Sequence, residues 1–397
     1  MTDDPYEPDS EEALAAVVRA AETTATPLEI RGGGTRLALG RPVQAARTLS
    51  LAALDGVTLY EPGELTLVAQ AGMPLKTLDD LLESENQQLT FEPPDMRALL
   101  GSTGEPTLGG AIATAASGPR RLRMGAARDA ILGVRYVNGH GEVLRAGGRV
   151  MKNVTGYDVP KLMCGAYGTL GIVTEIGLKV MPKSEVVRTL AIPGLTDERA
   201  VAALSAALAM PCDVSGAAHL PATVSRELGF ADAATLLRVE GFESQAAYRI
   251  ERLRDALAPF GAVDAVESDP WIAIRDAMMF AGDGRAVWRL SMKPTDAPRF
   301  VAALRDRMDV EAFYDWGGGL VWLACEEGED AAEPLVRQLL AKHDGHATLI
   351  RAGDAVRAAV PVFQPEPEAI ARLSDGLKRA FDPAGILNPG RMRIRGT

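Results

Sequence analysis

The first part of the chain alternates between two spacings of apolar residues. Between Glu11 and Glu22 the apolar residues recur at helical intervals, and Asp9 or Ser10 precedes them as a candidate N-cap. Short runs rich in β-branched residues predict strands between the helices. The expected order is a helix over 11–22, a strand over 28–30 that runs into three glycines, a strand over 65–71, a helix over 75–85, a hairpin over 131–145 and a strand over 172–180.

The second part of the chain continues this alternation and holds all four tryptophans. Amphipathic helices are expected over 197–210, 244–258, 295–307 and 331–342, with strands over 235–240, 287–292, 320–324 and 347–351 between them. This order is typical of an antiparallel sheet with helices on one face. A last helix over 368–381 and a turn-rich tail follow.

The length of the chain and the change in its residue composition together predict an α+β protein of more than one domain. A length of 397 residues is too great for one ordinary core and suits two or three domains. The first part is rich in glycine and β-branched residues, and the later part holds the tryptophans. Met181 and Pro182 mark the change, because a proline closes a strand there. We therefore expect domains over 1–183 and 184–360, followed by a C-terminal segment over 361–397.

The charge of the chain narrows the range of partners. The formal net charge is -11, and an acidic surface suits neither the phosphate backbone of nucleic acid nor an anionic bilayer. No run of about 18 apolar residues predicts a membrane span. Because the N-terminal residues are acidic and lack an apolar stretch, we expect a cytoplasmic protein without direct membrane insertion.

Cysteine usage excludes one kind of redox centre in this chain. Cys164, Cys212 and Cys325 lie far apart, without a C-x-x-C spacing. Such a set cannot build a self-contained iron–sulfur cluster or a cysteine-type zinc site. We predict no metal site, and a reducing compartment fits three isolated thiols.

Three glycine clusters carry the candidate chemistry of the first part. Glycine lets backbone amides approach a bulky anion such as a pyrophosphate, because no side chain blocks the approach. No cluster fits G-x-G-x-x-G before a helix or G-x-x-x-x-G-K-[ST], so neither a Rossmann site nor a P-loop is expected. The clusters are Arg31-Gly-Gly-Gly-Thr35, Gly101 to Gly110 with the small residues up to Gly118, and Gly165 to Ile172.

The sequences of these clusters and their order along the chain resemble those of the vanillyl-alcohol-oxidase family of flavoproteins, also called the PCMH type. Further matching segments are Asp129-Ala-Ile-Leu-Gly133, Gly147-Gly148, Lys152-Asn-Val-Thr-Gly-Tyr-Asp158, Gly168-Thr-Leu-Gly-Ile-Val-Thr174 and the tail Phe381-Asp-Pro-Ala-Gly-Ile-Leu-Asn-Pro-Gly390. Within the family, the segment from Lys152 to Asp158 and the compact length are most similar to the FAD-binding subunits of bacterial glycolate oxidases.

The resemblance implies a two-subdomain FAD-binding domain, split around an α/β cap domain with an antiparallel sheet. The segment 361–397 would return to the FAD-binding domain. It also implies an FAD-dependent oxidoreductase that oxidises a small 2-hydroxy acid such as glycolate to the 2-oxo acid. Its partners would be a larger FAD-binding sister subunit and an iron–sulfur subunit of a hetero-oligomer, and any contact with a membrane would come through them.

The resemblance also implies a set of cofactor-binding residues. Many family members bond their flavin covalently through a histidine beside the first loop, where this chain has Thr35, so we expect non-covalent FAD. The first loop would bind the pyrophosphate, the second would follow the pyrophosphate and the isoalloxazine, and the third would lie near the adenosine. The residues so assigned are Arg31, Gly32, Gly33, Gly34, Thr35, Thr107, Leu108, Gly109, Gly110, Thr114, Ser117, Gly118, Gly168, Gly171, Ile172 and Val173.

The catalytic residues stay open, because the chain departs from related 2-hydroxy-acid dehydrogenases. These enzymes carry a histidine-rich, metal-binding motif, whereas the similar segment Tyr314 to Leu320 has no histidine. His343 and His346 have ligand-like spacing, but no third ligand is near in sequence, so a solvated loop is expected. Arg120, Arg121 and Arg123 could attract an anionic substrate or form a solvated basic loop.

Two alternatives to a subunit of a glycolate-oxidising complex remain. One is a stand-alone FAD-dependent hydroxy-acid or alcohol dehydrogenase with the same fold. The other is a non-catalytic structural subunit with a degenerate FAD site. Intact glycine loops count against the second alternative, because larger residues would accumulate in an unused site.

Overall fold

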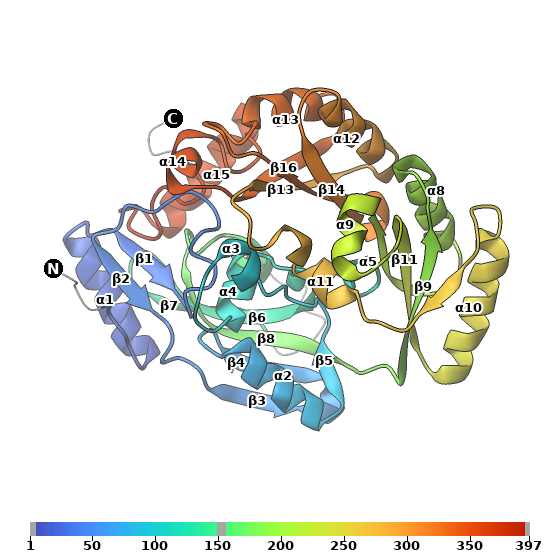
Figure 1. Cartoon of the computed structure of the whole chain (residues 1–397). Coiled ribbons are helices and arrows are strands. Elements are labelled where there is room, and N and C mark those ends of the chain that lie inside the picture. Colours follow the sequence, from blue (N-terminus) through green and yellow to red (C-terminus); the bar gives the residue numbers. More distant parts are fainter. Residues whose placement is uncertain (1–4, 149–155, 394–397) are drawn as a thin grey trace.

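The protein consists of two packed parts: the first is built on a two-stranded and a six-stranded sheet, and the second on a single sheet (Figure 1). The computed structural model describes residues 5–148 and 156–393, so Lys152 to Thr155 of the family segment from Lys152 to Asp158 lie outside the described residues. α1 (Glu11–Thr23) begins after Ser10, whose hydroxyl accepts a hydrogen bond from the backbone N–H of Ala13. β1 (Leu28–Arg31) then pairs in parallel with β2 (Arg47–Ser50).

The other strands of the first part form an antiparallel sheet of order β3–β4–β8–β6–β7, and β5 pairs with β8. The expected hairpin over 131–145 is confirmed as the β6–β7 pair. The strands are β3 (Val57–Glu61), β4 (Thr66–Gln70), β5 (Gln87–Leu89), β6 (Ile131–Val137), β7 (Val143–Gly147) and β8 (Ile172–Pro182). The helices are α2 (Leu75–Ser84), α3 (Arg97–Leu100), α4 (Leu108–Ala113), α5 (Arg121–Met124), α6 (Ala127–Ala130) and α7 (Val159–Met163), with the 3-10 turn η1 (Pro62–Glu64).

The second part is built on one eight-stranded antiparallel sheet, and we call it the cap. Its strand order is β12–β9–β11–β10–β14–β15–β13–β16. The strands are β9 (Val186–Pro193), β10 (Val214–Leu220), β11 (Ala234–Gly241), β12 (Asp264–Val266), β13 (Ala286–Met292), β14 (Val310–Asp315), β15 (Leu320–Cys325) and β16 (Gly345–Arg351). The long helices are α8 (Asp197–Leu208), α10 (Glu243–Leu257), α12 (Ala297–Arg305) and α13 (Glu333–Leu340).

The cap contains a repeat of topology that the sequence does not reveal. Each half runs strand, helix, strand, strand, helix, strand, and the strand order within the first half matches that within the second. The halves meet where His219 of β10 pairs with Tyr314 of β14. Two halves can share the same order of strands and helices when only the spacing of their apolar residues is similar. The repeat therefore leaves no fixed period in the sequence. The short connecting elements are α9 (Ala222–Ser225), η2 (Arg226–Leu228), α11 (Trp271–Arg275), η3 (Met278–Phe280), η4 (Pro294–Asp296), η5 (Trp316–Gly318) and α14 (Asp354–Ala359).

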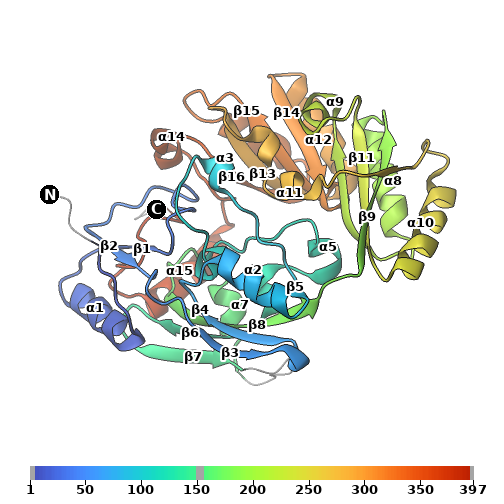
Figure 2. The same cartoon turned by 60° about the horizontal axis from the view of Figure 1, so that its bottom comes forward.

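The two faces of the cap sheet have different partners. Along β13, Trp288 and Leu290 belong to the core that α12 and α13 cover, as alternation along a strand requires. On the opposite face, Val287 shares a core with Leu39 and Met96 of the first part. Figure 2 shows this face turned toward the first part, with α3, α5 and α11 between the two sheets. The face without long helices is therefore available to line a site.

The C-terminal segment returns to the start of the chain. After α15 (Glu368–Phe381), the backbone N–H of Leu28 donates to the carbonyl of Ile386 at 2.8 Å, and the N–H of Asn388 donates to the carbonyl of Leu28 at 3.0 Å. These bonds place the tail beside β1 and the first glycine cluster. Among the helices of residues 5–148 and 156–393, none is long and apolar enough to cross a membrane.

A buried ionic network joins the cap to the first part. Arg238 of β11 donates to both carboxylate oxygens of Glu92 at 2.9 Å, and Arg120 pairs with Glu240 at 2.8 Å. The surrounding arginines lower the pKa of Glu92 against the opposing effect of burial. Enclosed pairs with several hydrogen bonds hold their partners in one geometry, so this network fixes the cap over the first part.

Candidate functional site

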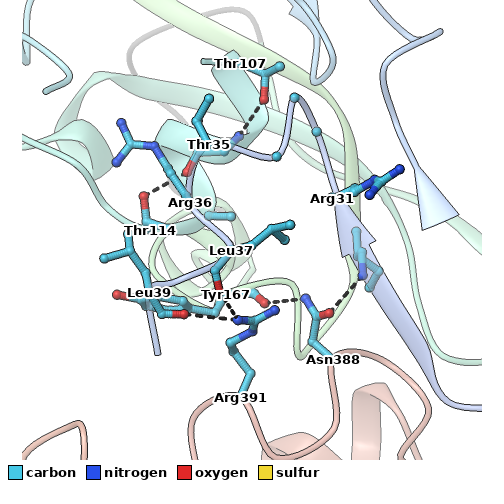
Figure 3. A pocket seen from close by; sticks show the side chains of 16 residues that line it. Arg31, Thr35, Arg36, Leu37, Leu39, Thr107, Thr114, Tyr167, Asn388 and Arg391 are labelled. Carbon is cyan, nitrogen blue, oxygen red and sulfur yellow. Dashed lines mark hydrogen bonds between the residues drawn. The ribbon is translucent and has the colours of Figure 1, made fainter. Parts of the chain in front are cut away.

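The first glycine cluster, the second cluster and the tail line one cavity, which is open to solvent (Figure 3). Eight of the sixteen residues that the sequence assigned to a cofactor line it. These eight are Arg31, Gly32, Gly33, Gly34, Thr35, Thr107, Gly110 and Thr114. The remaining lining residues are Ile30, Arg36, Leu37, Leu39, Ala113, Tyr167, Asn388 and Arg391.

The first cluster presents a run of free backbone amides. Among the hydrogen bonds of the described residues, none has a donor in the backbone N–H groups from Gly32 to Thr35. Gly34 has φ +80°, and a Cβ atom there would meet open space. Successive amides that face a cavity without internal acceptors form a concave site for an anion. β1 places this run at the cavity because the chain leaves the strand at Arg31.

The second cluster packs directly against the first. A Cβ on Gly33 would lie 1.8 Å from the carbonyl oxygen of Glu105, and one on Gly32 would lie 2.3 Å from the hydroxyl of Thr107. Thr107 also begins α4, because its hydroxyl accepts a hydrogen bond from the N–H of Gly110 at 3.2 Å. Glycine is thus needed here for the close approach of two loops.

The tail supplies residues that the sequence analysis did not assign. Asn388 accepts from the N–H of Ile30 and donates to the carbonyl of Tyr167, both at 2.8 Å. Arg391 donates to the carbonyl of Leu37 at 2.7 Å. Asn388 and the preceding residues belong to the tail segment that resembled the family, so that segment was the signal for these contacts.

The other half of the assigned residues lies outside this cavity. A Cβ on Gly109 would meet Ala71, and one on Gly171 would meet Tyr136, so both glycines permit close packing. Ser117 accepts a hydrogen bond from the N–H of Ala127, which positions α6. Ile172 and Val173 begin β8. The complete set outside the cavity is Leu108, Gly109, Ser117, Gly118, Gly168, Gly171, Ile172 and Val173.

The three arginines after the second cluster have separate environments. Arg120 is bound in the ionic network, and Arg123 pairs with Asp213 at 2.8 Å. Arg121 stacks over the ring of Trp316 at 4.3 Å and forms no ion pair in the described part of the chain. Of the three, only Arg121 keeps its guanidinium available for an anion.

One further arginine, Arg36, extends the positive charge of the cavity. Its enclosure by protein lowers the pKa of its guanidinium to about 10, so it remains protonated at neutral pH. Its Nη2 donates to the carbonyl of Pro94 at 2.5 Å, whereas its buried Nε has no hydrogen-bond partner. A buried donor without a partner is costly and is expected where a ligand completes the site.

The histidines do not form a metal site within residues 5–148 and 156–393, which contain no group of three metal-ligating side chains. His343 lies 3.6 Å from Asp296, and His346 lies on β16 rather than in the expected loop. The turn residue His140 contacts Glu22 at 2.6 Å.

His219 has partners that the sequence did not show. Its Nδ1 lies 3.0 Å from the hydroxyl of Thr235 and its Nε2 lies 3.3 Å from Asp197, so it is a satisfied core residue.

The geometry fits a dinucleotide cofactor. A pyrophosphate carries negative charge and many acceptor oxygens, and the free amides from Gly32 to Thr35 with the nearby cation of Arg36 supply donors for both. Gly34 lines the cavity, and a Cβ there would meet no atom within 4 Å. These features agree with FAD and do not suit a bound metal.

Comparison with known proteins identifies the same cofactor. A family described as FAD binding domain matches residues 6–147. The glycolate oxidase subunit GlcE of Escherichia coli (strain K12) is 34% identical over 387 residues, which cover 97% of each chain. A D-lactate dehydrogenase of Archaeoglobus fulgidus is 27% identical, over 97% of this chain and 90% of its own.

A solved structure extends the likeness to the whole fold. p-Cresol methylhydroxylase with bound substrate superposes with a TM-score of 0.69 at 16% identity, over 98% of this chain and 88% of its own. The expected PCMH-type α+β fold, the FAD cofactor and the oxidoreductase class are thereby confirmed. The chain belongs to the family of FAD-linked oxidoreductases that includes the glycolate oxidase subunit GlcE.

Proposed function

We propose that this chain is the FAD-binding subunit of a glycolate-oxidising complex. The complex oxidises a small 2-hydroxy acid to the 2-oxo acid, and electrons leave this chain for partner subunits. The observation that carries the proposal is the anion cradle from Gly32 to Thr35, in a chain whose full-length relative is a glycolate oxidase subunit. Residues 1–183 and 361–397 form the FAD-binding domain, and residues 184–360 form the cap.

The sixteen residues assigned from the sequence bind FAD without a covalent bond. Amides from Gly32 to Thr35 bind the pyrophosphate, and the Thr107 to Gly118 segment follows it toward the isoalloxazine. Gly168 and the start of β8 lie on the adenosine side. Thr35 supports non-covalent binding, because a neutral hydroxyl is a weak nucleophile. Bound FAD supplies a two-electron acceptor for the hydride of the alcohol carbon.

Electron transfer out of this chain requires partners. The thiols of Cys164 and Cys325 have pKa values raised by burial to about 12 and about 11, so neither is a ready metal ligand. The described residues hold no metal-ligating group of three. We infer that the larger FAD-binding sister subunit and an iron–sulfur subunit accept the electrons. Two relatives are named as glycolate oxidase subunits, GlcE and GlcD, which supports an assembly of several chains.

The visible spectrum of the purified chain with FAD tests the proposal. The spectrum is recorded anaerobically before and after glycolate, first for the chain alone and then with its sister subunits. Bleaching that requires the sister subunits is the expected result. Bleaching of the chain alone would instead show a stand-alone dehydrogenase.

Two outcomes would reject the proposed function. If the flavin stays oxidised with all subunits present, glycolate oxidation is wrong. If the chain shows no flavin absorbance after FAD is supplied, a structural subunit with a degenerate site replaces the proposal. A flavin released from the chain by denaturation, in the soluble fraction, would establish non-covalent attachment.

A further inference from the structure

The face of the cap sheet that lies toward the cofactor cavity carries a partly buried arginine. Arg289 follows Trp288 on β13, so its side chain lies on the face opposite the helix-covered core. Its neighbours across the strands are Trp322 of β15 and Thr348 of β16. The charge of Arg289 acts on Tyr167 and Arg36, which line the cavity. Arg289 therefore faces the cofactor from the cap.

Arg121 brings a second positive charge to the same place from the first part of the chain. Its guanidinium lies 4.3 Å from the ring of Trp316, and the indole N–H of Trp316 donates to the carbonyl of Gly118 at 3.1 Å. This arrangement fixes Arg121 at the end of the second glycine cluster. Partial desolvation, and then the charge of Arg289, lower the pKa of the exposed Arg121 side chain, so the two guanidinium groups repel each other.

Neither guanidinium group has an ion-pair partner in the described part of the chain. The side chain of Arg289 forms no hydrogen bond there, and the side chain of Arg121 has only its aromatic contact, while the charge of Asp129 acts on it from a greater distance. By contrast, Arg120 and Arg238, in the same interface, pair with carboxylates at 2.8 to 2.9 Å. Arg289 is partly buried, whereas Arg121 is exposed to solvent. A partly buried charge without a partner is unfavourable, and a second like charge nearby increases the cost. A bound anion would remove this cost.

The charges also extend to a neighbouring histidine. Partial desolvation, followed by the charges of Arg289, Arg121 and Arg337, lowers the pKa of His346, which lies at the surface. His346 lies on β16 opposite Ser291, two residues beyond Arg289 on β13. The direction of this shift is a further sign that positive charges gather here.

We propose that Arg289 of the cap and Arg121 of the first part together bind the carboxylate of the 2-hydroxy acid. This assignment rests on the proposed function and adds the residues that recognise its substrate class. The free amides of the first glycine cluster already serve the cofactor's phosphates, so the arginine pair is available for a second anion. Planar guanidinium groups match a carboxylate in a forked geometry, which lysine does not reproduce.

Binding of oxalate, an unreactive dicarboxylate, to the FAD-loaded protein tests the pair. Perturbation of the flavin absorbance reports the affinity in the wild type and in Arg289→Gln, Arg121→Gln and Arg289→Lys. Each glutamine variant is expected to weaken oxalate binding by about 10- to 100-fold, the loss of one charged hydrogen-bonding group. The oxalate affinity of Arg289→Lys should lie between that of the wild type and that of Arg289→Gln. The FAD content should be the same in all variants. Arg299→Gln, on the exposed side of α12, is the matched control and should bind oxalate normally.

Several outcomes would overturn the assignment. Wild-type oxalate affinity in both glutamine variants would do so, as would FAD-loaded wild type that binds no oxalate. If Arg289→Gln lowers FAD content or shifts the flavin midpoint potential while oxalate affinity stays the same, the arginines serve the cofactor instead. Failure of the proposed function looks different: oxalate binding depends on the arginines, yet glycolate never bleaches the flavin, even with the sister subunits.

Discussion

Substitution of Gly33 by alanine should separate the two glycine loops that enclose the cofactor cavity. The new Cβ would lie 1.8 Å from the carbonyl oxygen of Glu105 and 2.8 Å from its carbon. Both contacts are with backbone, so relief requires movement of a loop by more than about 1 Å. Gly33 does not have a positive φ, so the clash alone determines the effect. Overpacking of this kind costs about 1–3 kcal/mol.

The cost falls on FAD binding because the free amides of the first loop must stay aligned toward one anion. A loss of about 1–3 kcal/mol corresponds to a roughly 5- to 150-fold increase in the Kd for FAD. Quenching of flavin fluorescence on titration of the apoprotein measures this Kd. The midpoint of thermal unfolding without FAD tests whether the fold itself is intact.

Two glycine variants provide controls for the Gly33→Ala experiment. Gly63→Ala places a Cβ in open space on the exposed turn η1 and should leave the Kd unchanged. Gly34→Ala also meets open space, but φ +80° there costs about 1–2 kcal/mol in strain without a clash. If Gly33→Ala binds FAD as tightly as Gly63→Ala does, the close packing of the two loops does not support the cofactor site and our reasoning is wrong.

Three further results are expected from other parts of the molecule. Burial raises the pKa of Asp315 to about 7. Because the unfolded carboxyl titrates near pH 4, the free energy of unfolding should fall as pH rises between about 4 and 7, by at most about 1.4 kcal/mol per unit, and Asp315→Asn should flatten this slope in urea denaturation. Asn388→Ala removes the bonds to Ile30 and Tyr167, so it should destabilise the protein by about 1–3 kcal/mol and weaken FAD binding; unchanged unfolding would contradict this role of the tail. Thr35→His should leave FAD extractable by acid, because a nearby histidine alone lacks the surroundings for covalent attachment; flavin in the protein pellet would contradict that view.

Local sequence patterns predicted much of the chain because the relevant contacts are close in sequence. The spacing over 11–22 gave α1, and the Asn138-Gly139 turn gave the β6–β7 hairpin. The apolar pattern did not identify β3, β9 or β14 as strands. β14 is buried at all positions but one, so it lacks the alternation that reveals a half-exposed strand.

The family resemblance located the cofactor loops but not every residue at the cavity. The first glycine cluster lines the cavity as a continuous segment, so its local sequence was sufficient to predict these cavity residues. Asn388 and Arg391 reach the same cavity from more than 350 residues away in sequence, through bonds that only the folded tail can make. The sequence alone could not separate Arg120 and Arg123, which have carboxylate partners, from Arg121, which does not.

The sequence by itself determined the glycine loops, the apolar faces of the helices, the absence of a cysteine-based cluster and the class of cofactor. These properties depend on residue types at short spacing. The tertiary structure alone decided which charges remain without partners and which strands meet at the cavity. Arg289 lies 168 positions from Arg121, and only the pairing of the cap with the first part brings their charges together, because burial and charge pairing depend on the complete fold.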